Sequence, residues 1–177
     1  MSFPALAILT RVREVLEDGE GAVRAVTAGA YVAGTHTALD ALADSAASIG
    51  KPTVEASITA RVRHPSSPPR QSSYTLEQIT VEVRVVRPFD GITDLNVTAR
   101  TALNALAPSD GFDIAQALGW PGNMTATEAA SETGLVSGQL LDLGTSVASI
   151  EYTSGQNGRL VTTHQFSGIV RVVTPTS

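Results

Sequence analysis

PTVEASITARVR, residues 52–63, and EQITVEVRVVR, residues 77–87, are the two stretches that decide the fold. In both, apolar and polar residues alternate with a period of two, which is typical of a strand with one buried face and one wetted face. The predicted buried positions are Val54, Ala56, Ile58, Ala60 and Val62 in the first strand, and Ile79, Val81, Val83 and Val85 in the second. The predicted wetted positions are Glu55, Ser57, Thr59, Arg61 and Arg63 in the first strand, and Thr80, Glu82, Arg84 and Val86 in the second.

The segment that joins these strands, His64 to Leu76, reads HPSSPPRQSSYTL. It is too long and too rich in proline for a tight turn, so the sequence predicts a hairpin loop over 64–76 that protrudes beyond the sheet. Pro68, Pro69 and Arg70 stand near its centre and resemble a polyproline ligand only weakly. A protruding hairpin tip is the favoured interpretation.

Two main helices are predicted. The first begins near Pro4, because proline suits the first turn of a helix, and its apolar residues recur with a helical period. These residues are Ala5, Ile8, Leu9, Val12, Val15 and Leu16. The second is expected at 90–106. Pro88 is predicted to end the strand before it, and Pro108 is predicted to end the helix itself. A short strand is predicted at 22–26 and a short helix at 37–48.

The chain closes with a predicted hairpin. Its strands are expected at 146–153 and 159–173, because Asn157-Gly158 before a β-rich run is a strong hairpin signal. The stretch before it, 109–144, is rich in glycine and is predicted to be an irregular excursion with a helical turn at 113–118. Trp120, with Phe112, either anchors a partner or plugs the excursion onto the core. The elements together predict a single α+β domain over 1–177, with a mainly antiparallel β-sheet, two main α-helices packed on one face and a long loop insertion.

Composition narrows the classes of function. The chain has 177 residues, 42% of them hydrophobic, and a net charge of -5, which argues against a protein that grips nucleic-acid phosphates. It has no cysteine, so disulfides, thiol catalysis and cysteine-bound metals are excluded. We expect no secretory leader and no membrane helix, because no apolar run approaches about 18 residues.

The sequence predicts no catalytic residue, no cofactor and no metal site. His36, His64 and His164 lack metal-ligand spacing, and His164 is expected on a wetted strand face between Thr163 and Gln165. Asp40 with Asp44, and the acidic residues around 14–20, are interpreted as solvated helix surface. An enzyme would need a convergent polar cluster, such as His164 beside an aspartate or glutamate, that only folding could create.

Four stretches resemble the tail terminator, or tail-completion, proteins of long-tailed bacteriophages. They are FPALAILTRVREVLED with GAVRAV, TVEASITARVR with EQITVEVRVVR, ITDLNVTARTALNAL, and SVASIEY with LVTTHQFSGIVRVV. The resemblance lies in the order of the elements and in their residue patterns, and it involves no fixed motif.

This resemblance implies a structural virion protein that forms a hexameric ring at the head-proximal end of the tail tube. Such a ring halts tube polymerisation and joins the tail to the head. The implied partners are other copies of the chain, the tail tube protein and a neck or head-completion protein, while DNA passes through the channel without sequence-specific binding. The implied location is the tail or neck of a virion that is assembled in the host cytoplasm.

The candidate interface residues come from the strand faces, the hairpin loop and the excursion. They are Glu55, Arg61, Arg63, Pro68, Pro69, Arg70, Glu82, Arg84 and Trp120. The charged strand residues are expected to contact neighbouring subunits or the channel, and the 64–76 loop to dock on the tail tube or neck. The alternatives are a neck or head-tail connector, a minor tail protein, and a small-molecule binding module with an apolar pocket under Trp120 and Phe112.

Overall fold

The computed structural model describes residues 3–17, 48–49, 53–69, 72–90, 100–154 and 157–173. Its elements are α1 (Ala5–Glu17), β1 (Ser48–Ile49), β2 (Thr53–Arg63), β3 (Tyr74–Asp90), α4 (Arg100–Gly119), β4 (Leu141–Ser154) and β5 (Asn157–Val173). The short strand predicted at 22–26 lies outside the described residues, and so does the short helix predicted at 37–48 except for Ser48, which belongs to β1.

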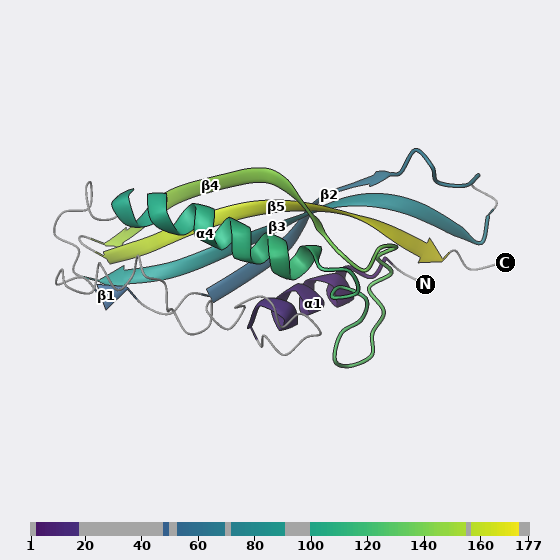
Figure 1. The fold of residues 1–177 in the computed structure, drawn as a ribbon, viewed down its shortest axis with the longest axis horizontal. Coiled ribbons are helices and arrows are strands. Elements are labelled where there is room, and N and C mark those ends of the chain that lie inside the picture. Colours follow the sequence, from purple (N-terminus) through teal and green to yellow (C-terminus); the bar gives the residue numbers. More distant parts are fainter. Residues whose placement is uncertain are drawn as a thin grey trace.

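The strands form one antiparallel sheet. β3 lies at its centre, with β5 on one side and β2 and β1 along the other, and β4 lies beyond β5. Figure 1 shows this long, twisted sheet with α1 and α4 on the same side of it. The predicted class, a single α+β domain with two helices on one face of an antiparallel sheet, is confirmed.

The core lies between the helices and one face of β3 and β5. The alternation predicted for the second strand is confirmed there, because its four apolar residues on that face are fully buried. The helix face predicted for α1 is also confirmed, because four of its six predicted apolar positions are buried. The buried residues of the core include Ile79, Val81, Val83 and Val85 of β3, Phe166 and Val170 of β5, Ile8, Val12, Val15 and Leu16 of α1, and Ile114, Ala117 and Leu118 of α4.

A β-bulge in β2 corrects the predicted faces of that strand. Ile58 lies opposite Val81, but Ala60 lies opposite Thr80, so Thr59 is one extra residue. An extra residue exchanges the two faces of all that follows it, because side chains alternate with a strict period of two.

The residues after this bulge therefore lie on the faces opposite to those predicted. Arg61 and Arg63 lie on the helix-bearing face, where the Arg61 guanidinium stacks 4.4 Å from the ring centroid of Phe3 and forms an ion pair with Glu77. This ion pair raises the pKa of Arg61. Val62, predicted to be buried, turns to the other face and is 58% exposed.

The prediction of a wetted face on β3 is also wrong at one position. Val86 is buried, as is Val161, its direct partner on β5. Two valines opposite each other in neighbouring strands cover one another.

Pro88 does not end β3, which continues to Asp90. Pro88 lies between the last pair with β2, at Val86, and the pairs of β1 with Phe89 and Asp90. The ladder on this side changes partner at Pro88, so the missing N–H of proline is tolerated there. At its other end β3 begins at Tyr74, so the hairpin loop is shorter than predicted.

Pro108 does not end the second helix, which runs from Arg100 to Gly119. The part of the prediction at 91–99 lies outside the described residues, and 109–119 is helix where an excursion was predicted. Proline inside a helix removes one hydrogen bond, at a typical cost of about 3 kcal/mol. The burial of Ile114, Ala117 and Leu118 beyond it offsets that cost.

Candidate functional site

A buried polar cluster joins α4 to the sheet. The Arg87 guanidinium of β3 donates to both carboxylate oxygens of Asp110 on α4, at 2.7 and 2.8 Å. The Thr162 hydroxyl of β5 donates to the same carboxylate at 2.7 Å. The three residues are at most 1% exposed. Asp110 lies within the stretch predicted to be irregular, so sequence alone gave no reason to expect these contacts.

His164 belongs to the same interior, which corrects its predicted position on a wetted face. It is 2% exposed, because side chains alternate along β5 and His164 lies on the same core-facing side as Thr162 and Phe166. A Cβ placed at Gly111 of α4 would lie 3.1 Å from its Nδ1, so the helix passes directly over the imidazole at a residue without a side chain.

Burial lowers the pKa of His164, and the charges of Asp110 and Asp142 oppose that shift. The imidazole is therefore held in its neutral form at neutral pH. Its Nε2 has no hydrogen-bond partner within the described part of the chain, and the same holds for Nε of Arg87.

Folding thus creates a polar cluster around His164, the arrangement that an enzyme would require. The cluster is closed to solvent, however, and its carboxylate is already held by Arg87 and Thr162. General acid–base chemistry needs a group within hydrogen-bond reach of a bound substrate. The geometry favours a structural role, in which the cluster holds α4 against β3 and β5.

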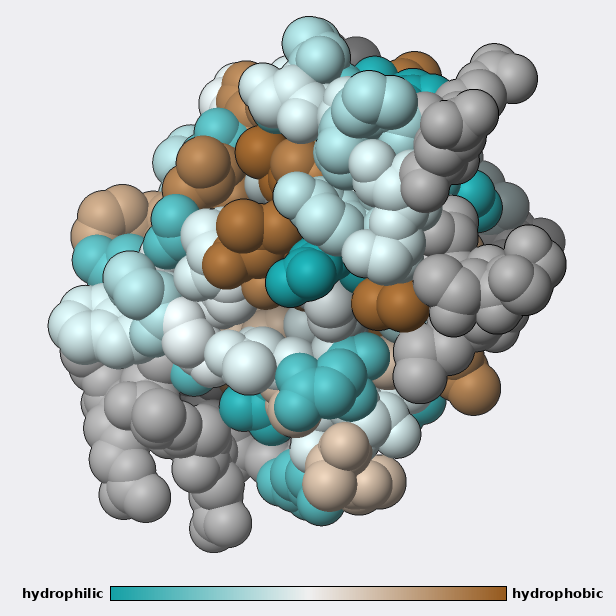
Figure 2. Space-filling model, turned by 90° about the vertical axis from the view of Figure 1, so that its right-hand side faces the viewer, coloured by the Kyte–Doolittle hydropathy of each residue, from teal (hydrophilic) through white to brown (hydrophobic). Residues whose placement is uncertain are grey.

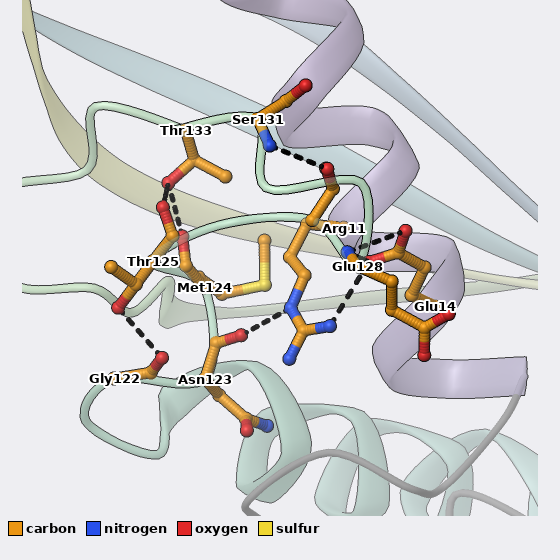
Figure 3. Close-up of polar contacts among 10 residues, drawn as sticks. Arg11, Glu14, Gly122, Asn123, Met124, Thr125, Glu128, Ser131 and Thr133 are labelled. Carbon is orange, nitrogen blue, oxygen red and sulfur yellow. Dashed lines mark hydrogen bonds and ion pairs between the residues drawn. The ribbon is translucent and has the colours of Figure 1, made fainter.

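A second polar network attaches the excursion to α1 (Figure 3). The Arg11 guanidinium donates to the Asn123 carbonyl oxygen at 2.7 Å and pairs with Glu14 at 3.1 Å. The Glu14 carboxylate in turn accepts from the backbone N–H of Glu128 at 3.1 Å. Glu14, interpreted from sequence as solvated helix surface, therefore binds the excursion.

Over residues 120–140, backbone hydrogen bonds to β5 hold the excursion in place. Gly134 accepts from the N–H of Arg171 at 2.8 Å, and Val136 donates to the Ile169 carbonyl at 2.8 Å, so it runs beside the end of β5. Phe112 and Trp120 are 63% and 50% exposed, which contradicts the interpretation that they plug the excursion onto the core. Met124, Leu135 and Leu140 are the large hydrophobic residues that it buries.

β4 forms an edge of the sheet that is exposed on both faces. All nine residues from 141 to 149 are exposed, and the strand carries four large exposed hydrophobic side chains. They are Leu141, Leu143, Val147 and Tyr152, each between 48% and 56% exposed. Among the described residues β4 pairs only with β5. A long, apolar, unpaired edge strand is a template for pairing with another chain.

The predicted interface residues are spread over different surfaces. Arg84 of β3 forms ion pairs with Glu55 of β2 at 3.1 Å and with Glu151 of β4 at 2.8 Å, on the sheet face away from the helices. Glu82 lies on this face as predicted. Arg61 and Arg63 lie on the opposite face, so the predicted set of charged residues does not form one surface.

The described part of the 64–76 loop belongs to the β2–β3 hairpin, which projects at one end of the molecule (Figure 1). Pro68 accepts a hydrogen bond from the Arg63 guanidinium through its carbonyl oxygen, and Pro69 is exposed. Arg70 lies outside the described residues. The structure does not bring this tip together with Trp120 into one described contact.

A groove of about 500 Å³ lies where the excursion meets the end of β5 and Pro4. Figure 2 shows hydrophobic surface gathered near the centre of this end of the molecule, with hydrophilic residues around it. Leu135, Val136, Val172 and Val173 line the groove, and Phe112 and Trp120 are not among its lining residues. This does not match the pocket that was expected under the two aromatic residues.

The described residues contain no group of histidine, aspartate and glutamate side chains that could hold a metal ion. No helix in the described ranges has the length and hydropathy of a membrane span. Comparison of the chain with protein-family models, with curated proteins and with solved structures found no match.

Proposed function

We propose that this protein is a structural virion subunit, a tail terminator that forms a ring at the head-proximal end of a phage tail tube. The ring halts polymerisation of the tube and provides the surface on which the head docks. In this function the chain performs no catalysis, and its partners are its own copies, the tail tube protein and a neck or head-completion protein.

The observation that carries the proposal is the open edge at β4. Its residues are exposed on both faces, and four of them are large and hydrophobic. Such an edge is costly in a protein that stays monomeric, because it invites uncontrolled pairing. A closed ring covers edges in every copy at once. The closed, internally neutralised cluster around Asp110 supports an assembly role over an enzymatic one.

A neck or head-tail connector, or a minor tail protein, is the nearest alternative, since an open edge serves these assemblies equally well. A small-molecule binding module is less well supported. The end groove is open, and Phe112 and Trp120 are exposed and do not line it. Thermal stabilisation by a small ligand would favour the binding module.

The decisive experiment measures the mass of the purified full chain by light scattering and images the same sample by negative stain, with and without tail tube. We expect a ring, or a monomer that becomes a ring on the end of added tubes. A chain that stays monomeric and leaves tube ends bare overturns the proposal. A ring that binds heads or portals but not tubes supports the connector instead.

A further inference from the structure

The two edges of the sheet, β4 and β2, differ in what they present. β4 is apolar and carries two acidic residues, Asp142 and Glu151, and no basic one. β2 carries Glu55 with two arginines, Arg61 and Arg63. Both edges are long, with 14 and 11 residues, so either can support a ladder of many hydrogen bonds.

We propose that β4 of one copy pairs with β2 of the next copy, so that the sheet continues from subunit to subunit. This rests on the ring proposed above and specifies its contact. The sheet is four strands wide along β2, β3, β5 and β4, and each neighbouring pair is antiparallel, so the edge strands β2 and β4 run in opposite directions. A head-to-tail neighbour therefore continues the antiparallel pattern at every contact and leaves neither edge open.

Both strands carry an irregularity, in β2 between Ile58 and Ala60 and in β4 between Asp142 and Ser146, so the register between copies is counted through their partners on β3 and β5. Ser57 of β2 and Ser149 of β4 lie near the strand centres and on the same face of the sheet, away from the helices. From Ser57 to Arg63 the partners on β3 move by five positions, and from Ser149 to Asp142 the partners on β5 also move by five. Placing Ser57 opposite Ser149 thus brings Arg63 opposite Asp142.

This register creates a pair of opposite charges between copies, Arg63 with Asp142. It also places Glu55 opposite Glu151, two carboxylates that each form an ion pair with Arg84 of their own copy. Arg63 and Asp142 both lie on the helix-bearing face, Arg63 because of the bulge after Ile58. Both are exposed, and within the copy the Arg63 guanidinium contacts a carbonyl oxygen at Pro68. A two-fold pairing of β4 with β4 would instead bring two acidic strands together and leave β2 uncovered.

The absence of native cysteine allows a clean cross-linking test. Ser57→Cys and Ser149→Cys are prepared as separate single variants, mixed and oxidised, and the products are separated without reductant. Cysteines in directly opposed strands lie within disulfide reach. We expect covalent dimers in the mixture and none in either variant alone. Ser66→Cys, exposed at the hairpin tip and out of register, replaces Ser57→Cys in the matched control.

Any other result of the cross-linking experiment contradicts part of the proposed β2–β4 contact. A dimer from Ser149→Cys alone indicates the two-fold pairing. A cross-link that forms with Val147→Cys or Glu151→Cys in place of Ser149→Cys overturns the register. A light-scattering oligomer without any β2–β4 cross-link overturns this contact but leaves ring assembly standing, whereas a monomer with and without tail tube overturns both.

A charge swap tests the ion pair independently. Arg63→Asp and Asp142→Arg, each alone, should raise the concentration needed for assembly about 2- to 5-fold, the range of an exposed ion pair. The combined variant should recover wild-type assembly, because the opposite charges again meet at every contact. Equal or greater loss in the combined variant contradicts the pairing, since a merely local effect of each substitution would add.

Discussion

At the scale of single residues, the contacts of Asp110 explain how a helix with an internal proline is held on the sheet. Its carboxylate is fully buried and receives hydrogen bonds from Arg87 and Thr162. Two charges in a low-dielectric interior are tolerated only when they are paired and well hydrogen-bonded. The pair therefore specifies where α4 sits on the sheet more than it adds to overall stability.

Replacement of one partner of this pair should be far more harmful than replacement of both. Asp110→Leu leaves a buried, uncompensated guanidinium and should lower the free energy of unfolding by about 3–5 kcal/mol. Arg87→Leu combined with Asp110→Leu should recover much of that loss, because no buried charge remains. Urea unfolding followed by circular dichroism measures both. Additive losses in the double variant would show that the two residues act independently.

His164 should make stability depend on pH. Its pKa lies below the ordinary 6.5 because burial penalises the charged form. As the pH falls below about 6.5, the unfolded chain binds a proton that the folded chain does not, so the free energy of unfolding decreases. Above that pH the residue has no such effect.

The measurement is the melting temperature between about pH 7.5 and 5.5, a range above the ordinary pKa of carboxylates. The wild type should lose stability across this range, and His164→Leu should lose less. His64→Asn, which leaves His164 in place, should keep the wild-type slope. An equally steep loss in His164→Leu would place the titrating group elsewhere.

At the scale of elements, α1 organises the excursion as well as the core. One face of the helix is buried against the sheet, while Arg11 and Glu14 bind the excursion at Asn123 and Glu128 (Figure 3). Hydrogen bonds to charged groups contribute about 1.5–3 kcal/mol each when they are shielded from water. The Arg11 bond to Asn123 is partly buried, whereas the Glu14 bond to Glu128 is exposed, so Arg11 contributes more to the attachment.

Arg11→Ala should loosen the excursion without unfolding the domain. We expect faster proteolytic cleavage within 128–131, a segment exposed in the folded chain, because the segment then opens more readily. Limited proteolysis with mass mapping measures this, and Gln116→Ala, at an exposed site on α4, is the control. Cleavage that is unchanged in Arg11→Ala would mean that the backbone contacts with β5 suffice.

At the scale of the whole molecule, the fold is an open sheet with helices on one face, and within the described part of the chain its edge strands pair on one side only. Proteins that stay monomeric commonly protect an edge strand with charged side chains. The edge strand β4 instead exposes large hydrophobic side chains. The ion pairs that Arg84 makes to β2 and β4 tie both edge strands to the centre of the sheet. Such exposed pairs contribute little stability, so their effect is mainly on the geometry of the edges.

A charge in the middle of β4 should separate folding from assembly. Val147→Lys places an ammonium at a position that is 56% exposed. The free energy of unfolding should therefore change by no more than about 0.5 kcal/mol. The same group buried in a contact between copies should abolish the ring in light scattering. Leu6→Lys, at a 79% exposed position on α1, should leave assembly unchanged. Intact rings in Val147→Lys would remove β4 from the interface.

The sequence by itself determined the elements whose residues repeat with a clear period. The face of α1 and the core residues of β3 were predicted, because each of these elements buries one face. The closing hairpin of β4 and β5 was predicted from the Asn157-Gly158 turn signal. Hairpin and helix signals of this kind depend only on neighbours along the chain.

Tertiary structure alone decided the features that depend on distant residues. The bulge at Thr59 changed the faces of Arg61 and Arg63 because strand register is set by the partner strand. α4 continues through Pro108 because its burial on the sheet outweighs the local cost of proline. His164 sits in a closed polar cluster because a helix more than 50 residues away in the chain crosses over it at Gly111. No local pattern carries these contacts, since each arises only when separate elements pack together.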